Sequence, residues 1–248
     1  MAAFRRTDEK YHYKWTMNET SSARISQKEW EKAKTMFDYF VGDEKTSRDE
    51  IIDRFSQNSQ QYEKIMEAVN YTSPMHTAQA TAELFPSNRE DVFILDVAAG
   101  TGLCGEKLYY HGFRKMDALE PSTRMLDEAR KKGLYSRYFI EALGENALDI
   151  ANETYDAVTI SAMSSMVLIK LPLEAFGELI RIVKPDGYII NTAFYDLFSD
   201  NGDDKAVSLR ENMKTLEYQG KWKQMELKRF PEAAVGSDVG VSVHKVLA

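Results

Sequence analysis

The residues of this sequence whose types and spacing could do chemistry gather in one short segment, Asp96-Val-Ala-Ala-Gly100-Thr-Gly102. An apolar run over residues 92–97 ends in the carboxylate, which is typical of a buried parallel strand before a turn. Glycines there let the backbone approach a ligand closely, and open α/β sheets bind ligands outside the carboxyl ends of their strands. The segment predicts a ligand site between a first strand and a first helix, with a tight turn that binds nothing as the alternative.

A second carboxylate, Glu120, follows the apolar pair Ala118-Leu119. At the tip of a second strand, a carboxylate can accept hydrogen bonds from both hydroxyls of a ribose. Met125 begins the next predicted helix and can lie flat against an adenine, or it can be an ordinary core methionine. Together with the glycine turn, these residues predict a ligand that contains a nucleoside.

Two cofactors compete for this site. Gly100-Thr-Gly102-Leu-Cys-Gly105 matches the dinucleotide pattern G-x-G-x-x-G, which would make the chain an NAD(P)-dependent reductase. However, Asp96 would face the pyrophosphate with a like charge, and Ala98-Ala99 separates the strand from the first glycine. The sulfonium of S-adenosylmethionine is cationic and carries no phosphate, so acidic residues suit it. The sequence therefore favours S-adenosylmethionine over a nicotinamide cofactor.

The elements that must position these residues alternate between strand and helix. Strands are expected over residues 92–97, 116–119, 138–140, 155–161 and 187–193, and helices over 103–110, 123–132, 173–183 and 206–216. Two further β-like stretches, 222–230 and 239–246, are joined by a loop too short for a helix, so they should pair antiparallel. The pattern predicts an α/β fold with a doubly wound, mostly parallel sheet of seven strands and a terminal antiparallel hairpin.

The chain before the first strand is different in character. Residues 1–25 are polar and aperiodic, and we expect a flexible arm. Ser26-Gln-Lys-Glu29 and Ser47-Arg-Asp-Glu50 are capping-box patterns, each followed by apolar residues at helical spacing. We therefore expect N-terminal helices over residues 26–90 and the α/β domain over 91–248. The apolar faces of the helices either cover the site as a lid or pack on the edge of the sheet.

Composition limits the partners. The 248 residues carry a net charge of −7, which disfavours a nucleic-acid partner because phosphate contacts need basic residues. The single cysteine, Cys104, excludes an internal disulfide and a multi-cysteine metal site, and we expect no metal. No apolar run is long enough to span a membrane, and no signal peptide is recognisable. A cytoplasmic protein without a membrane partner is expected.

Four motifs in order resemble the class I, seven-stranded S-adenosylmethionine-dependent methyltransferases. They are the segment from Asp96 to Gly102, Leu119-Glu120-Pro-Ser, Tyr155-Asp-Ala-Val158 and Val183-Lys-Pro-Asp-Gly187. The resemblance covers roughly residues 55–248 and includes the terminal hairpin. More narrowly, Ala98-Ala-Gly-Thr-Gly-Leu103, Gly133-Leu-Tyr135 and Leu143-Gly144 are similar to the methyltransferase-like proteins of the Williams–Beuren region.

The resemblance implies a role for each matching residue. The implied cofactor-binding residues are Asp96 with the turn residues Ala98, Gly100 and Gly102 around the methionine part, Glu120 at the ribose, Met125 on one side of the adenine, Leu143 and Gly144 on its other side, Ser161 and Ala162 near the sulfonium, and Tyr62 as an aromatic lid.

Two of these positions depart from the family pattern. Ala98 stands where a glycine is usual, which needs no positive φ if the turn begins one residue later. Gly144 stands where an acid commonly receives the adenine amino group, and neighbouring Glu145 could substitute for it.

The methyl acceptor is constrained mainly by residues that are missing. No catalytic base can be named, since His76 and His111 are expected at the surface or at helix ends. Ser161-Ala-Met-Ser164 follows the fourth strand, where enzymes that methylate base or amide nitrogens carry Asn/Asp-Pro-Pro-Tyr. With the acidic charge, this favours a small molecule or a protein side chain over nucleic acid as the acceptor, and a small molecule is the first expectation. A non-catalytic cofactor-binding or scaffold protein is a further alternative.

Overall fold

The computed structural model describes residues 26–248, so the predicted flexible arm lies outside the described residues. One seven-stranded sheet has the order β3-β2-β1-β4-β5-β7-β6. Only the pairings of β7 with β5 and β6 are antiparallel, which confirms the predicted sheet and its terminal hairpin. The strands are β1 (Phe93–Val97), β2 (Lys115–Leu119), β3 (Tyr138–Phe139), β4 (Tyr155–Ser161), β5 (Val183–Phe194), β6 (Trp222–Ala234) and β7 (Ser237–Val246).

The helices fall into a group before β1 and a group that connects the strands. The first group is α2 (Gln27–Val41), α3 (Arg48–Gln57), α4 (Ser59–Ala68) and α5 (Ser73–Leu84). The second is α6 (Leu103–Tyr110), α7 (Thr123–Arg130), α8 (Ser165–Leu168), α9 (Leu173–Ile182), α10 (Tyr195–Phe198), the 3-10 turn η1 (Asp204–Ala206) and α11 (Val207–Tyr218).

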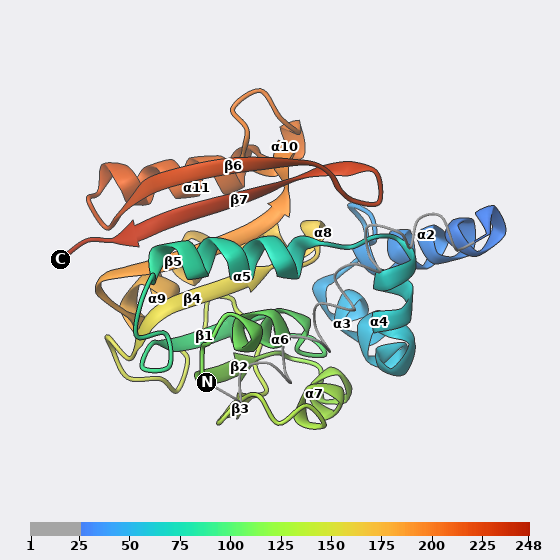
Figure 1. Cartoon of the computed structure of the whole chain (residues 1–248). Helices are drawn as coiled ribbons and strands as arrows, with labels where there is room; N and C mark the ends of the chain where they lie inside the picture. Colours follow the sequence, from blue (N-terminus) through green and yellow to red (C-terminus); the bar gives the residue numbers. More distant parts are fainter. Residues whose placement is uncertain (1–25) are drawn as a thin grey trace.

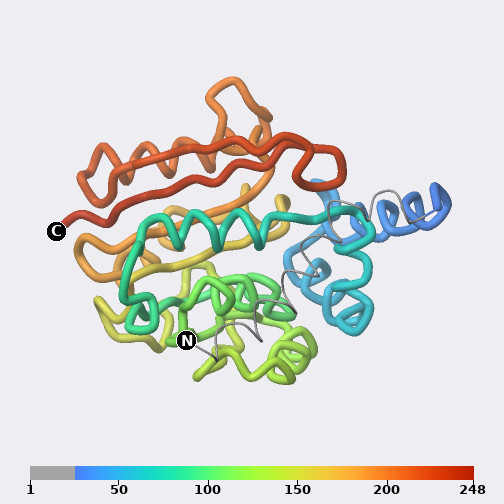
Figure 2. Tube along the Cα trace, viewed as in Figure 1, coloured from blue at the N-terminus to red at the C-terminus, as the bar shows by residue number. Residues whose placement is uncertain are grey.

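Each face of the sheet carries its own hydrophobic core, because side chains alternate along a strand. Ile94 of β1 packs with residues of α5, α6 and α7 on one face. Its neighbour Leu95 packs with residues of α9 and α11 on the other face. Figures 1 and 2 show α5 lying along the sheet, beside α6. The sheet is thus covered on both sides, as a parallel sheet requires.

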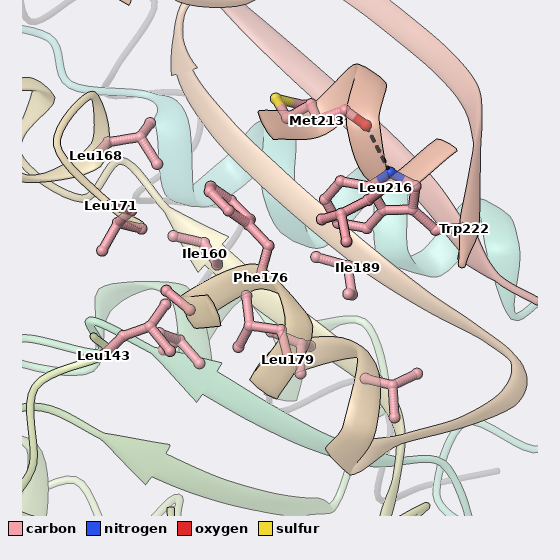
Figure 3. Close-up of a cluster of buried hydrophobic side chains, with 14 of the residues drawn as sticks. Leu143, Ile160, Leu168, Leu171, Phe176, Leu179, Ile189, Met213, Leu216 and Trp222 are labelled. Carbon is pink, nitrogen blue, oxygen red and sulfur yellow. Dashed lines mark hydrogen bonds between the residues drawn. The ribbon is translucent and has the colours of Figure 1, made fainter. Parts of the chain in front are cut away.

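The larger core includes Trp222, at the start of β6 (Figure 3). Its indole is buried and its ring edge meets Phe176 of α9. The indole N–H donates to the carbonyl of Met213 at 3.0 Å, so the buried nitrogen has a partner and α11 is tied to the hairpin.

Helices α2, α3 and α4 form a cap beyond the carboxyl ends of the parallel strands (Figure 1). Phe40, Ile65 and Val69 belong to a small core of their own inside this cap. The predicted capping box at Ser26 is present, with both reciprocal hydrogen bonds. At Ser47 the side chain caps α3, whereas Glu50 binds Arg54 at 2.5 Å instead of completing the box.

The segment between the cap and α5 is held by the tip of the hairpin. The backbone N–H of Thr72 donates to the carbonyl of Ala233 at 3.0 Å, and that of Val235 donates to the carbonyl of Val69 at 3.3 Å. From there α5 runs back along the sheet, while the domain boundary at residue 91 stays a prediction. No helix in residues 26–248 is long and apolar enough to cross a membrane.

Candidate functional site

The glycine turn after β1 has three residues with a left-handed backbone: Ala98 (φ 54°), Gly100 (φ 55°) and Gly102 (φ 84°). The turn is held by the N–H of Ala99, which donates to the carbonyl of Leu119 at 3.2 Å. The expectation that Ala98 needs no positive φ is therefore wrong. The turn begins at Ala98 itself, and a left-handed alanine costs roughly 1–2 kcal/mol.

Asp96 lies beneath this turn and does not reach the open side of it. Its carboxylate is fully buried and accepts hydrogen bonds from the Tyr135 hydroxyl at 2.6 Å and the Thr159 hydroxyl at 2.9 Å. Burial raises the pKa of Asp96 to about 6, against the lowering effect of these donors. The side chain therefore fixes the turn against β4 and the loop that follows α7, and Asp96 is not among the residues that line the cleft.

Glu120 at the tip of β2 is placed by two backbone donors. Its carboxylate oxygens accept from the N–H of Gly100 at 3.1 Å and of Ser122 at 2.9 Å. Burial raises the pKa of this carboxyl to about 7, while both backbone hydrogen bonds lower it. The carboxylate is thus oriented before any ligand arrives, with lone pairs still free to accept.

A cleft of about 910 Å³ opens over the turn, between the strand ends and the cap. Its charged lining residues are Arg48, Glu120 and Glu141, and the rest of its walls is mostly apolar. Eight of the predicted site residues line it, namely Tyr62, Ala98, Gly100, Glu120, Met125, Leu143, Ser161 and Ala162. A mainly apolar cleft with a few converging polar groups is typical of a small-molecule site.

The three other predicted residues lie behind the walls of the cleft. Asp96 is one of them. Gly102 is the N-cap of α6, where an added Cβ would lie 3.3 Å from the Tyr135 ring. Gly144 is buried, and a Cβ there would lie 3.0 Å from the guanidinium of Arg48. These glycines are needed for close packing around the site.

Two charged lining residues were missed by the sequence argument. Glu141 lies two residues after the end of β3 and lines the cleft, whereas Glu145, the suggested substitute, is exposed and outside it. The signal that finds Glu141 is an acid at a strand tip, the same signal that singled out Glu120. Arg48 is the first residue of α3, and no pattern in the sequence marks it.

The cap is attached to the site by polar contacts. The Ser56 hydroxyl of α3 lies 2.6 Å from the hydroxyl of Ser122, whose own N–H donates to Glu120. Lys132 pairs with Glu63 of α4 at 2.5 Å and with Glu106 of α6 at 2.9 Å. Two hydrogen bonds, Ser56 to Ser122 and Ser122 to Glu120, thus connect the cap with the carboxylate of Glu120.

Tyr62 of α4 and Tyr71, in the linker between α4 and α5, both line the cleft. The Tyr62 ring meets Phe40 and Phe55 edge-on, each at 5.8 Å between centroids. Burial raises the pKa of both phenols well above the usual value, so their hydroxyls stay protonated. Within residues 26–248, no cluster of three or more metal-binding side chains occurs.

The strand order, the glycine turn and the two strand-tip acids define a class of protein. Residues 94–187 match the model of the methyltransferase domain family, and this part of the chain is similar to S-adenosylmethionine-dependent methyltransferases. The family implies S-adenosylmethionine as the cofactor.

Two curated proteins are similar in sequence to parts of this chain. The chain is 31% identical to Methyltransferase-like protein 27 of Homo sapiens over 162 residues, which cover 65% of this chain and 63% of that protein. It is 33% identical to the ubiquinone/menaquinone biosynthesis C-methyltransferase UbiE of Rhizobium meliloti over 124 residues, 47% of this chain and 46% of that protein. The matched stretches thus span less than two thirds of either relative.

Solved structures agree on the fold. One is an S-adenosylmethionine-dependent methyltransferase from Aquifex aeolicus, with a TM-score of 0.51 and 19% identity. The match covers 77% of this chain and 98% of that one. At this identity the likeness concerns the arrangement of the sheet and helices alone.

Proposed function

We propose that this protein transfers a methyl group from S-adenosylmethionine to a small molecule. The observation that carries the proposal is the pair of strand-tip acids, Glu120 and Glu141, opening on one mainly apolar cleft over the glycine turn. When bound, S-adenosylmethionine supplies an electrophilic methyl group on a sulfonium.

The residues present suit this cofactor. The lone pairs that Glu120 keeps free accept the ribose hydroxyls, because Gly100 and Ser122 already hold its carboxylate in position. Met125 and Leu143 flank the adenine from the two sides of the cleft. Glu141 accepts the adenine amino group. This is the role that the family pattern gives to an acid at position 144, and for which the sequence suggested Glu145.

The methionine part is assigned to the backbone of the turn and to the end of β4. Ala98 and Gly100 belong to the turn, and Ser161 and Ala162 lie beside it, because Val97 of β1 pairs with Ile160 of β4. Ala162 has a positive φ of 52° and donates its N–H to the carbonyl of Thr192 at 2.7 Å. A strained non-glycine backbone of this kind is often found at ligand sites. Asp96 is a positioning residue in this scheme.

The cleft favours a sulfonium over the pyrophosphate of a nicotinamide cofactor. The acid Glu120 binds the N–H of Gly100, which a pyrophosphate would need, and its charge would oppose a phosphate there. Arg48, the one basic residue in the described lining, is placed near Gly144 and away from the turn.

Calorimetric titration tests the proposal. Adenosylhomocysteine should bind and NADH should not, and a ligand at a hundred times its Kd should add about 2.7 kcal/mol of unfolding free energy. Glu120→Ala should weaken binding by about 1.5–3 kcal/mol, because a charged hydrogen-bond acceptor is lost. Glu145→Ala, an exposed acid outside the cleft, is the matched control and should bind normally. No binding of either adenosyl compound to the folded wild-type protein contradicts the proposal.

A further inference from the structure

A second cavity of about 480 Å³ lies directly beside the cleft. The two cavities share six lining residues, namely Phe55, Tyr62, Tyr71, Ala162, Met163 and Ser164. Ala162 lines both cavities, and the sulfonium is proposed to bind beside it. A molecule in the second cavity can therefore approach the methyl group of S-adenosylmethionine. We refer to this second cavity as the acceptor chamber.

The walls of the acceptor chamber come from parts of the chain far apart in sequence. Phe37 and Phe40 belong to α2, Phe194 ends β5, and Ala234 and Val239 flank the tip of the hairpin. The rings of Phe37 and Phe194 meet edge to face at 6.3 Å between centroids. The same Phe37 ring lies 6.4 Å from Tyr71. The chamber is therefore surrounded by aromatic rings.

Among residues 26–248, no side chain that lines the chamber can take a proton near neutral pH. Its described polar lining consists of the hydroxyls of Tyr62, Tyr71, Ser73, Ser164 and Ser165. The charged residues Arg48, Glu120 and Glu141 line the cleft over the glycine turn and do not line the chamber. The two phenols are held protonated by burial, so each is a hydrogen-bond donor and not a base.

These walls select the charge of the acceptor. An anionic acceptor would lose its hydration among apolar side chains, which is costly without a paired cation. An alkylamine is protonated at neutral pH and must first lose a proton, as must an alkyl thiol or a phenol, whereas an aryl thiol is largely an anion there. A ring nitrogen of the imidazole or pyridine type has its lone pair free at neutral pH, and it needs no base.

Resting on the proposed methyl transfer, we propose that the acceptor is a small, flat, uncharged nitrogen heterocycle, methylated on its ring nitrogen in this chamber. The nitrogen lone pair forms the new bond to the methyl carbon as the carbon–sulfur bond breaks, and that bonding pair stays on sulfur. The positive charge passes from sulfur to the ring, and no proton is transferred. The π systems of Phe37, Tyr71 and Phe194, which line the chamber, stabilise the cation that develops.

The test uses the full chain with methyl-labelled S-adenosylmethionine and four probes of similar size: quinoline, benzimidazole, thiophenol and benzoate. Label should appear on the two heterocycles as their N-methyl products, identified by mass. Phe37→Leu and Phe194→Leu keep the chamber apolar but remove a π face, and each should slow this transfer about tenfold. Phe85→Leu, an aromatic that packs on Phe113 and Tyr188 and lines neither cavity, is the control.

Two measurements separate this inference from the proposed function. Adenosylhomocysteine binding by each variant should equal that of the wild type, because both changed rings lie outside the cleft. Intact cofactor binding with label on thiophenol or benzoate, or with no label on either heterocycle, overturns the inference and leaves the proposed function standing. Transfer to quinoline that ignores both chamber substitutions also overturns it. Absence of cofactor binding overturns the proposed function itself.

Discussion

The carboxylate of Glu120 holds the N–H of Gly100 at 3.1 Å, which connects the tip of β2 to the turn after β1. The same carboxyl is buried and has its pKa raised to about 7. The residue that orients the turn is therefore also the one whose charge changes near neutral pH. Several measurable consequences come from this relationship and from the contacts around it.

Adenosylhomocysteine affinity should rise with pH through about 7 and then level off. The ionised carboxylate of Glu120 is the better acceptor for the ribose hydroxyls, so below its pKa binding must first remove a proton. The association constant should then fall by up to about tenfold per pH unit. Titrations at pH 6, 7 and 8 check this, and Glu120→Gln should flatten the profile. An equally steep profile in that variant would assign the titration to another group.

The same shift has the opposite effect on folding. Since the folded pKa of Glu120 exceeds the ordinary 4.5, the unfolded chain loses this proton first as pH rises. The folded state therefore binds more protons between 4.5 and about 7, and the contribution of this group to stability falls across that window.

Asp96→Asn should lower the free energy of unfolding by about 1–3 kcal/mol. Tyr135 and Thr159 both donate to the buried carboxylate, and an amide nitrogen would oppose one of these donors. Urea unfolding measures the loss. Tyr135→Phe, which removes one donor only, should cost less. A variant of Asp96 that unfolds like the wild type but loses cofactor affinity would instead place this carboxylate in contact with the ligand.

Ala98→Gly should stabilise the protein by up to about 1 kcal/mol, since glycine adopts a φ of 54° without the clash of a Cβ. Ala99 has no positive φ, so Ala99→Gly serves as the matched control and should be destabilising. Thermal unfolding of the two variants gives the comparison. Equal destabilisation by both substitutions would mean that the methyl of Ala98 contributes packing that outweighs its strain.

Addition of adenosylhomocysteine should slow hydrogen exchange at amides around Tyr62. The Tyr62 side chain belongs to α4 and lines the cleft. A ligand that orders the cap excludes water from the backbone around this residue. Amides of β6 and β7 far from the tip should exchange as before. Ser56→Ala removes the contact to Ser122 and should reduce the ligand-induced protection. Exchange around Tyr62 that is the same with and without ligand would identify the cap as fixed packing.

The sheet could be predicted because its information is local. Apolar runs mark the strands one by one, and the lack of room for a helix between residues 230 and 239 predicts the antiparallel hairpin. The order of the strands in the sheet was not predicted. Helices α4 and α5 were not separated within the predicted cap region, since apolar periodicity indicates a buried face but not its partner. The short helices α8 and α10 carry too few residues to produce a period.

The site was predictable to the extent that its residues follow strands. Glu120 follows β2 and Ser161 ends β4, and the structure brings both residues to the cleft. What escaped prediction depends on orientation: the carboxylate of Asp96 points down to Tyr135, and Ala98 carries the left-handed backbone expected of a glycine. Arg48 reaches the cleft from the cap, and contacts of that range leave no local pattern.

The three hydrogen bonds between residues 69–72 and the hairpin tip have a consequence for folding during synthesis. The cap is translated before β1, yet its linker is fixed to Ala233 and Val235, which are translated after β5. The sheet up to β5 can assemble while the helices above it remain untethered. Contacts so distant along the chain form slowly, so both cavities should be completed in the last stage of folding. A nascent chain stalled before residue 233 would have its glycine turn built and still lack a closed chamber.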